Sequence, residues 1–235
     1  MKVYLPYRGE FGGELLKIVP RINGDPSPKV VCHAIFKGCL YPSAEHYNVD
    51  LYETSEQIMD ILGKDYEYIK PLGAKYQAKW FVPESVGCFF KTDVVIFPRK
   101  KKNMAAMNWD EWGSIVQMLK AEGINVFAAG HKDYSYHLDC HSAWDHLDSL
   151  GATIHAIKSS QVRIGLITAL HVLSLMCGKN CIVLTSKAGN KSIRSNAGPN
   201  LSYLKFADHL NVGWQVWPLL ENPKKIVKGI ICNIK

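Results

Sequence analysis

The residues best placed to do chemistry in this sequence lie in the stretch Gln161–Leu184. Its pattern predicts a buried strand, a tight turn at Thr168 and Ala169 that opens a helix, and a second buried strand. In a parallel α/β sheet such a turn lies at the carboxyl end of a strand, where ligands bind. A helix start also offers free backbone N–H groups and a positive dipole end, so the turn is predicted to bind a phosphate of a nucleotide-like ligand. The alternative is that Thr168 only caps the helix.

Positively charged side chains just past the predicted strand ends could neutralise the same anion. These residues are Arg8, Arg99 and Lys100. His131, in the segment after the strand predicted at Asn125–Ala129, could touch the nucleotide. Arg99 and Lys100 open a run of four cations, Arg99–Lys102, which is otherwise typical of a solvated loop. Arg163 is a further candidate, although it lies inside a predicted strand and could instead pair with an acid.

A second basic segment, Ser186–Asn200, follows the strand predicted at Cys181–Leu184. Lys187, Lys191 and Arg194 lie there among Gly, Ser and Asn residues. Because this segment should emerge at the same edge of the sheet, its cations are predicted to bind an acceptor molecule or to clamp a phosphate. A surface loop without a ligand is the alternative.

The elements that must position these residues alternate between short apolar strands and helices. Strands are predicted at Lys2–Tyr7, Lys29–Phe36, Val49–Tyr52, Tyr66–Ile69, Asp93–Phe97, Asn125–Ala129, Thr153–Ile157, Val162–Gly165 and Cys181–Leu184. Helices are predicted at Leu15–Val19, Ser55–Leu62 (capped by Ser55), Trp109–Glu122 (ended by Gly123), Ser142–Leu150 and Thr168–Cys177. Such alternation predicts an α/β protein with doubly wound parallel sheets. We expect two Rossmann-like halves, residues 1–90 and 91–235, with a cleft between them.

Composition is consistent with this class. The chain has 235 residues, of which 47% are hydrophobic, and no run approaches the roughly 20 apolar residues of a membrane span. The seven cysteines are scattered without paired spacing, and the start of the chain has no signal-peptide pattern, which predicts a cytoplasmic protein with reduced thiols. A net charge of +7 is compatible with a polyanionic partner such as nucleic acid.

The second half resembles the carboxyl-terminal domain of glycosyltransferase family 9, the heptosyltransferase group. The similar segments are DVVIFPR, NWDEWGSIVQMLKAEGINVFAAG and TIHAIKSSQVRIGLITALHVLSLMCGKNCIVL. When the last segment is aligned on Gly178-Lys179, the positions that match the family pattern are Thr168, Leu170 and Leu173. The family's Asp, Gly and His are replaced by Ile167, Ala169 and Val172, and His171 lies one place from the expected His.

The amino terminus resembles the same family over GEFGGELLKIVPRI, residues Gly9–Ile22. The family's acidic residue falls on Glu14, and the resemblance implies that this carboxylate is the general base for the acceptor hydroxyl. Gly12 and Gly13 either lie close to the donor or only permit a turn. The alternative for Glu14 is an acid favoured in the first turn of a helix.

The resemblance implies a GT-B glycosyltransferase that uses a nucleotide-sugar as co-substrate, with no cofactor and no metal. Residues 1–90 would bind the acceptor, and residues 91–235 the nucleotide-sugar. Its compact length is similar to that of enzymes from viral or phage genomes, which would act in the host cytoplasm. A hydroxylated base in DNA is one candidate acceptor because the chain is basic, and a carbohydrate or lipid-linked acceptor is the one that the family implies.

Two other hypotheses stay open. Ile167 and Val172 lack the polar groups of the family, which favours a non-catalytic module that binds nucleotides or nucleic acid. A different nucleotide-using α/β enzyme would share only the architecture. The densest group of potential metal ligands is His131, His137, Cys140, His141 and His146, but its spacing does not match a zinc motif, and we expect no metal there.

Overall fold

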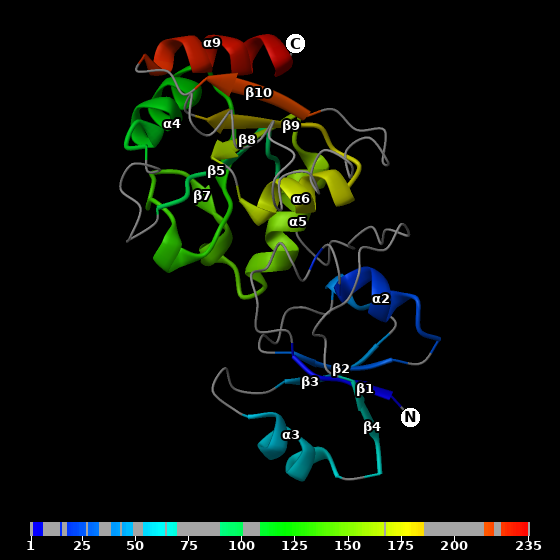
Figure 1. Ribbon diagram of the computed structural model, residues 1–235. Helices are drawn as coiled ribbons and strands as arrows, with labels where there is room; N and C mark the ends of the chain where they lie inside the picture. Colours follow the sequence, from blue (N-terminus) through cyan, green and yellow to red (C-terminus); the bar gives the residue numbers. More distant parts are fainter. Residues whose placement is uncertain are drawn as a thin grey trace. The chain divides into compact units, whose positions relative to one another are not determined.

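The computed structural model describes the chain in segments, namely residues 2–6, 15, 18–26, 28–32, 39–42, 44–48, 54–63, 65–69, 90–100, 109–166, 168–185, 214–218 and 222–234. The chain divides into two units, Met1–Glu84 and Ser85–Lys235, which are labelled by element in Figure 1. Each unit is built on its own parallel sheet. No helix in these described segments is long and apolar enough to cross a membrane.

The first unit contains a sheet of four parallel strands. In chain order these are β1 (Lys2–Tyr4), β2 (Lys29–Cys32), β3 (Glu45–Asn48) and β4 (Glu67–Ile69). Their order across the sheet is β3-β2-β1-β4, so the winding direction reverses between β1 and β4. Ile58 of a nearby helix packs with Val3, Leu5 and Val31 to form the core.

Two helices accompany this sheet, α2 (Val19–Asn23) and α3 (Ser55–Leu62). The bounds of α3 are as predicted, but its cap is Thr54 rather than Ser55. The Thr54 hydroxyl accepts a hydrogen bond from the Gln57 N–H at 3.2 Å, and the Gln57 side chain accepts one from the Thr54 N–H at 2.7 Å. This reciprocal pair needs a Gln three residues after the cap, which only Thr54 has.

The third strand of this sheet, β3, was not predicted from the sequence. β3 covers the polar residues Glu45–Asn48, whereas the strand predicted at Val49–Tyr52 lies outside the described residues. Lateral contacts explain why so polar a segment pairs with β2. The Lys29 Nζ lies 2.9 Å from a Glu45 carboxylate oxygen and 3.2 Å from the Tyr47 hydroxyl.

The second unit contains a sheet of six parallel strands. These are β5 (Val94–Phe97), β6 (Val126–Ala128), β7 (His141–Ser142), β8 (Val162–Leu166), β9 (Cys181–Thr185) and β10 (Trp214–Pro218). Their order is β10-β9-β8-β5-β6-β7. The described helices are α4 (Trp112–Ala121), α5 (Ser149–Ser159), α6 (Ala169–Met176) and α9 (Pro223–Ile234).

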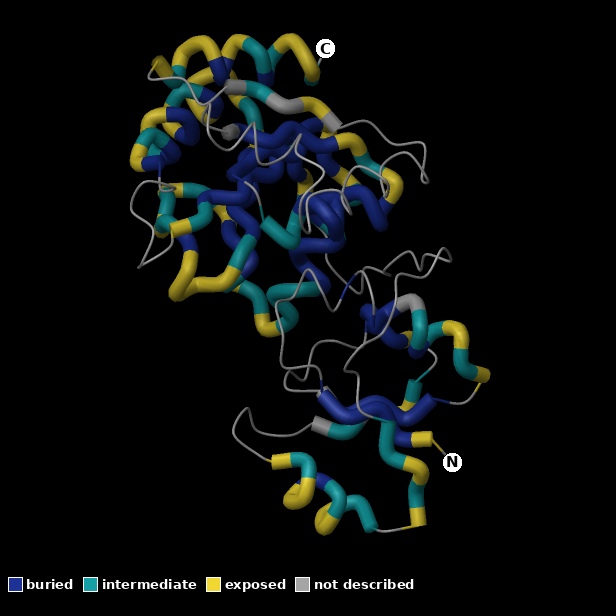
Figure 2. The backbone as a smooth tube through the Cα atoms, viewed as in Figure 1, coloured by how far each residue is buried: buried dark blue, intermediate teal, exposed yellow. Residues whose placement is uncertain are grey.

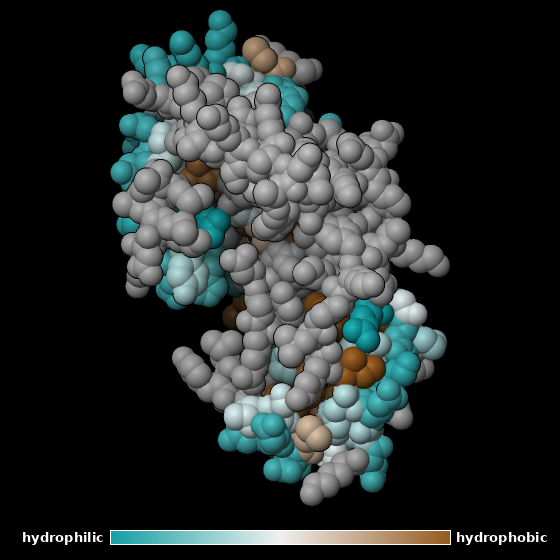
Figure 3. All heavy atoms as spheres, viewed as in Figure 1, coloured by the Kyte–Doolittle hydropathy of each residue, from teal (hydrophilic) through white to brown (hydrophobic). Residues whose placement is uncertain are grey.

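Helices α4 and α9 pack together on one face of this sheet (Figure 1). Trp112 and Ile115 of α4 and Ile230 of α9 join one cluster with strand residues such as Val94 and Ile96. All four residues of β5 are buried, as expected for a strand covered on both faces. Figure 2 shows α4 and α9 with exposed outer sides, whereas α5 and α6 are largely buried. Figure 3 shows mostly hydrophilic residues on the outer side of α9, with a hydrophobic group among them.

Two predicted elements of the second unit are wrong. The predicted helix Ser142–Leu150 is replaced by β7 and a 3₁₀ turn (Ala143–Asp145), and the predicted strand Thr153–Ile157 lies inside α5. Helix α5 is capped by Asp148, whose carboxylate accepts the Gly151 N–H at 2.7 Å. Because α5 is buried on nearly all sides, its apolar run has no clear period, and such a run cannot be told from a buried strand. The predicted α/β class, with a parallel sheet in each half, is confirmed.

Candidate functional site

The carboxyl edge of the six-stranded sheet has the topology of a ligand site. Strands β5, β6 and β7 follow one another in one direction, and β8, β9 and β10 follow in the other. The winding therefore reverses between β5 and β8, and ligands of doubly wound sheets bind in the crevice at such a switch point. Phe97 of β5 is paired with Gly165 of β8, so the segments after both strands leave the sheet side by side.

Gly165 permits the close approach of these two strands. A Cβ atom at this position would lie 2.9 Å from the Phe97 carbonyl oxygen and would overlap the Phe97 side chain. The Phe97 ring meets the His171 ring edge to face, with 4.9 Å between centroids. Gly165 therefore belongs to the packing beneath the switch point.

Thr168 and Ala169 form the start of helix α6, as predicted. The Thr168 hydroxyl accepts a hydrogen bond from the Leu170 N–H at 3.0 Å, so Thr168 is a helix cap. The N–H groups of Thr168, Leu170 and His171 donate to acceptors within the turn, whereas the Ala169 N–H has none among the described residues. Both side chains are half-buried. The turn is thus a capped helix start whose Ala169 N–H has no acceptor in the described segments, and phosphate binding there stays a prediction.

His171 is a fixed part of the same turn. Its Nδ1 accepts the Thr168 N–H at 3.3 Å, so the ring hydrogen lies on Nε2, which donates to the Ile182 carbonyl at 3.2 Å. Burial lowers the pKa of His171 to about 4, so the imidazole is neutral at pH 7. His171 ties the start of α6 to β9, and both of its ring nitrogens are bonded to backbone groups.

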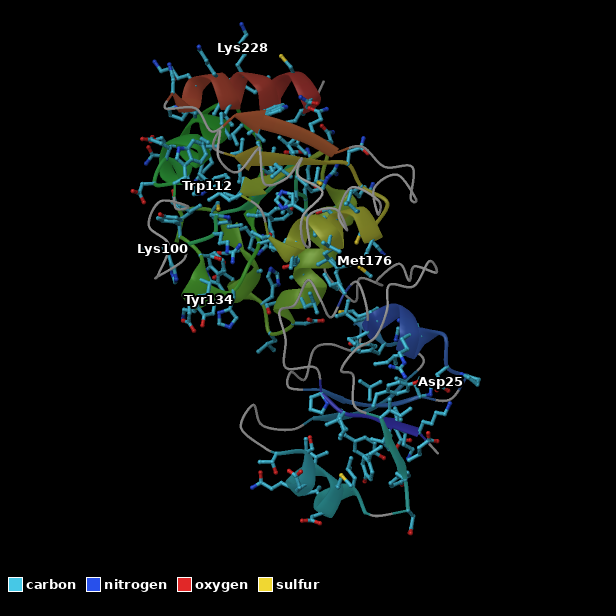
Figure 4. The ribbon with its side chains drawn as sticks, in the orientation of Figure 1. Asp25, Lys100, Trp112, Tyr134, Met176 and Lys228 are labelled. Carbon is cyan, nitrogen blue, oxygen red and sulfur yellow. The ribbon has the colours of Figure 1, made fainter. Side chains whose placement is uncertain are left out.

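The segment after β5 is joined to the segment after β6. Arg99 forms an antiparallel bridge with Ser135, and the Lys100 N–H donates to the Tyr134 carbonyl at 2.8 Å. Figure 4 labels Lys100 and Tyr134 in this region. Arg99 is half-buried and Lys100 is exposed. These contacts place the two predicted cations beside the switch point, in a loop that the backbone holds in position.

Tyr134 and Tyr136, in the segment after β6, were not predicted as site residues. The Lys100 Nζ lies 5.2 Å from the centroid of the Tyr136 ring, and the Tyr136 hydroxyl donates to an Asp110 carboxylate oxygen at 2.6 Å. Burial and the Asp110 contact raise the pKa of Tyr136 to about 12. Tyr134 is 56% exposed. The aromatic spacing in KDYSYH was the only sequence signal for them.

His131 lies in the segment after β6 and caps the 3₁₀ turn Lys132–Tyr134. Its Nδ1 accepts the Asp133 N–H at 3.2 Å, and its ring is 5.3 Å from the Tyr134 ring, centroid to centroid. The His131 side chain is exposed. It therefore has a local structural role and also presents an accessible ring next to Tyr134.

Several predicted site residues lie outside the described part of the chain. They are Arg8, Gly12, Gly13, Glu14, Lys187, Lys191 and Arg194. The first four follow β1, which borders the switch point of the first sheet, and the last three follow β9. Their predicted roles stay predictions.

Arg163 is not at the carboxyl edge of the six-stranded sheet. It lies near the amino end of β8, 94% buried, where its guanidinium donates to the Asn180 carbonyl at 2.8 Å and to the Ser160 carbonyl. Ser160 ends α5 and Asn180 directly precedes β9, so neither carbonyl belongs to a phosphate-binding turn. The negative end of the α5 dipole favours the cation there. The hypothesis that Arg163 contacts the diphosphate is therefore wrong.

Replacing Arg163 with Met is expected to lower the free energy of unfolding by about 2 kcal/mol, because the buried Ser160 carbonyl and the partly buried Asn180 carbonyl lose this donor. Urea unfolding monitored by circular dichroism would measure it. Arg163→Lys should recover part of the loss. An unchanged midpoint in the Met variant would show that these carbonyls find other donors.

The residues of the proposed histidine and cysteine group do not converge on one point. In the described segments no three His, Cys, Asp or Glu side chains are arranged to hold a metal ion. The Nε2 of His137 pairs with the Lys132 carbonyl at 3.1 Å, and burial raises the pKa of Cys140 to about 11. The Nε2 atoms of His141 and His146, however, are 2.8 Å apart.

Comparisons with known proteins bear on the fold. The sequence matches no protein-family model and no curated protein. Among solved structures, E. coli heptosyltransferase WaaC with ADP is similar, with a TM-score of 0.53 and 10% identity over 99% of this chain and 100% of that chain. TibC, an iron-containing dodecameric glycosyltransferase from enterotoxigenic E. coli H10407, has a TM-score of 0.47 and 11% identity over 79% of this chain. The chain spans 58% of the length of TibC.

E. coli ADP-heptose lps heptosyltransferase II has a TM-score of 0.42 and 11% identity over 95% of this chain and 79% of that chain. At such identities only the likeness to WaaC carries weight, and it concerns the architecture. It agrees with the doubly wound order of both sheets. The chain therefore has an α/β architecture similar to that of WaaC, with a parallel sheet in each unit, as predicted from its alternating strands and helices.

Proposed function

We propose that the protein is a GT-B glycosyltransferase of the family 9 type, which moves a sugar from a nucleotide-sugar to a hydroxyl acceptor. The observation that supports this proposal is the switch point between the adjacent strands β5 and β8. Arg99 and Lys100 follow β5 there, and the start of α6 follows β8. A fold similar to WaaC, whose structure holds ADP, makes an ADP-sugar the first donor to test.

In this proposal the second unit stabilises the leaving nucleotide diphosphate. The Ala169 N–H and the dipole of α6 would face the phosphates beside Thr168, while Arg99 and Lys100 supply positive charge. The exposed rings of His131 and Tyr134 offer a surface on which the base could stack. Charge that develops on the diphosphate would thus be met by groups already held in position.

The acceptor hydroxyl would be deprotonated by Glu14, whose segment follows β1 at the switch point of the first unit. Arg8, Gly12 and Gly13 would border the donor from the same segment. Lys187, Lys191 and Arg194 would hold the acceptor. We infer that the reaction needs no metal, because backbone and cationic groups can neutralise the diphosphate, and turnover should then persist in EDTA.

The acceptor is proposed to be a hydroxyl on an anionic molecule, and a hydroxylated base in DNA is the first to test. Support comes from the net charge of +7 and from the exposed lysines Lys224, Lys225 and Lys228 on α9. Binding to DNA should weaken steeply as salt increases. Binding of a neutral glycan that is insensitive to salt would point to the carbohydrate acceptor of the family instead.

The test is calorimetric titration of the full chain with ADP-, UDP-, GDP- and CMP-sugars. We expect one of them to bind, and Lys100→Ala to weaken it about tenfold, since a hydrogen bond to a charged group contributes about 1.5 kcal/mol. Lys179→Ala is the matched control, because Lys179 follows α6 at the opposite edge of the sheet. No binding by any nucleotide-sugar would overturn the proposal.

A second candidate is a binding module without catalysis. It is favoured by Val172, which is fully buried where the family has a His and so cannot contact a ligand. The two candidates differ in one outcome. A module would bind the nucleotide or nucleic acid but release no nucleotide diphosphate with any acceptor.

A further inference from the structure

Two histidine side chains converge at the β7 edge of the second sheet. The Nε2 atoms of His141 and His146 are 2.8 Å apart, and their ring centroids are 4.7 Å apart. His141 belongs to β7, which is separated from β5 by β6. This pair is therefore not part of the switch point, and a role for it is independent of the proposed glycosyltransferase activity.

The pair shares a single hydrogen. At 2.8 Å one Nε2 must carry the hydrogen and the other must present its lone pair, since two N–H groups cannot face each other at hydrogen-bonding distance. If the ring that carries this hydrogen took the tautomer with the hydrogen on Nδ1, both neutral imidazoles would direct an Nε2 lone pair at the same point. This is the arrangement that a metal ion with nitrogen ligands requires.

The turn between the two histidines is held in place by its own hydrogen bonds. The Asp145 carboxylate accepts the Ser142 N–H at 3.0 Å and the Ser142 hydroxyl at 2.7 Å, which closes the turn that places His146 over His141. Asp145 also brings negative charge close to His141. The backbone between the two rings is thus already ordered before any ion binds.

Aromatic packing fixes the ring planes. The Phe90 ring lies 4.7 Å from the His141 ring and 5.2 Å from the His146 ring, centroid to centroid. Phe127 stacks on Phe90 at 5.0 Å and contacts both histidines as well. His155, which also packs on Phe90, points its Nε2 at the Phe90 carbonyl and so does not compete.

We propose that His141 and His146 form a two-histidine site for a divalent transition-metal ion such as Zn²⁺. Zinc–nitrogen bonds of about 2.0–2.1 Å in tetrahedral geometry place two ligand nitrogens about 3.3 Å apart, so the rings need to separate by only about 0.5 Å. The described residues offer no third protein ligand, and water would complete the shell at these partly exposed side chains. Imidazole ligands favour zinc, copper and nickel over calcium or magnesium.

The test titrates the full chain, freed of metal by chelation, with Zn²⁺ alone. All proteins carry Cys232→Ser, because Cys232 is an exposed thiol that could bind zinc. The parent should bind one ion at this site, and His146→Gln should weaken it at least about tenfold. His137→Gln is the matched control and should change nothing, because the His137 Nε2 is turned to the Lys132 carbonyl.

A direct readout separates ligation from a change in folding. Adding Cu²⁺ should broaden the ring-proton NMR signals of His141 and His146 before those of His137, and the circular dichroism spectra of the variants should match the parent. Zinc affinity that is equal in the parent and His146→Gln, or no zinc binding up to millimolar concentration, would overturn the proposal.

Discussion

Replacing Glu14 with Gln is expected to lower the rate of sugar transfer about 10²–10⁴-fold and to leave the affinity for the nucleotide-sugar unchanged. The amide has almost the shape of the carboxylate but cannot take a proton from the acceptor hydroxyl. Strand β1 ends at Tyr4 beside β4, where the winding of the first sheet reverses, and the chain then enters the segment that contains Glu14. A base carried there would work from the ligand edge of its own unit.

The matched control is Glu10→Gln, four residues earlier in the same segment, which removes the same charge. Initial rates of nucleotide diphosphate release should distinguish the two variants, and calorimetry should show equal donor binding. Equal rates in both variants would assign the base to another residue. Loss of donor binding in Glu14→Gln would make Glu14 a donor contact instead of the base.

The stability of the second unit is expected to fall by about 3 kcal/mol between pH 6.5 and pH 4 because of His171. Burial lowers the pKa of this ring from an ordinary 6.5 to about 4. Below pH 6.5 His171 is protonated in the unfolded chain, whereas in the folded chain it stays neutral until about pH 4. Acid therefore favours unfolding between these two pH values. The neutral ring is needed because its Nδ1 accepts the Thr168 N–H.

Urea unfolding at pH 7.0, 6.0, 5.0 and 4.5 would measure the effect. In His171→Gln the side chain cannot titrate, so the variant should be less stable at pH 7 but should lose about 2 kcal/mol less than the parent between pH 7.0 and pH 4.5. Parallel curves for the two proteins would show that other groups cause the acid sensitivity. Because His171 holds the start of α6, donor binding should also weaken in acid, in the parent only.

The sequence alone determined most elements that form the carboxyl edge of the six-stranded sheet. The bounds of β5, α4, β6, β8, α6 and β9 differ from the predictions by no more than three residues at either end. Their signals are local: apolar runs for buried strands, a helical apolar period in α4, Gly123 with a φ of 73° after α4, and Thr168 before α6. Thr168, Ala169, Arg99, Lys100 and His131 were also found on the predicted edge, since each follows closely on a strand.

Only the tertiary structure decided which strands are neighbours and what the polar side chains do. The reversal between β5 and β8 depends on pairing across more than sixty residues, which no local pattern encodes. Arg163 was a candidate for the diphosphate and His171 lies one place from the family's His, but the partners of both side chains are backbone groups. Helix α5 and strand β3 were missed for the same reason. One is buried on nearly all sides and the other is held by Lys29, so burial and lateral contact, rather than periodicity, fixed their structure.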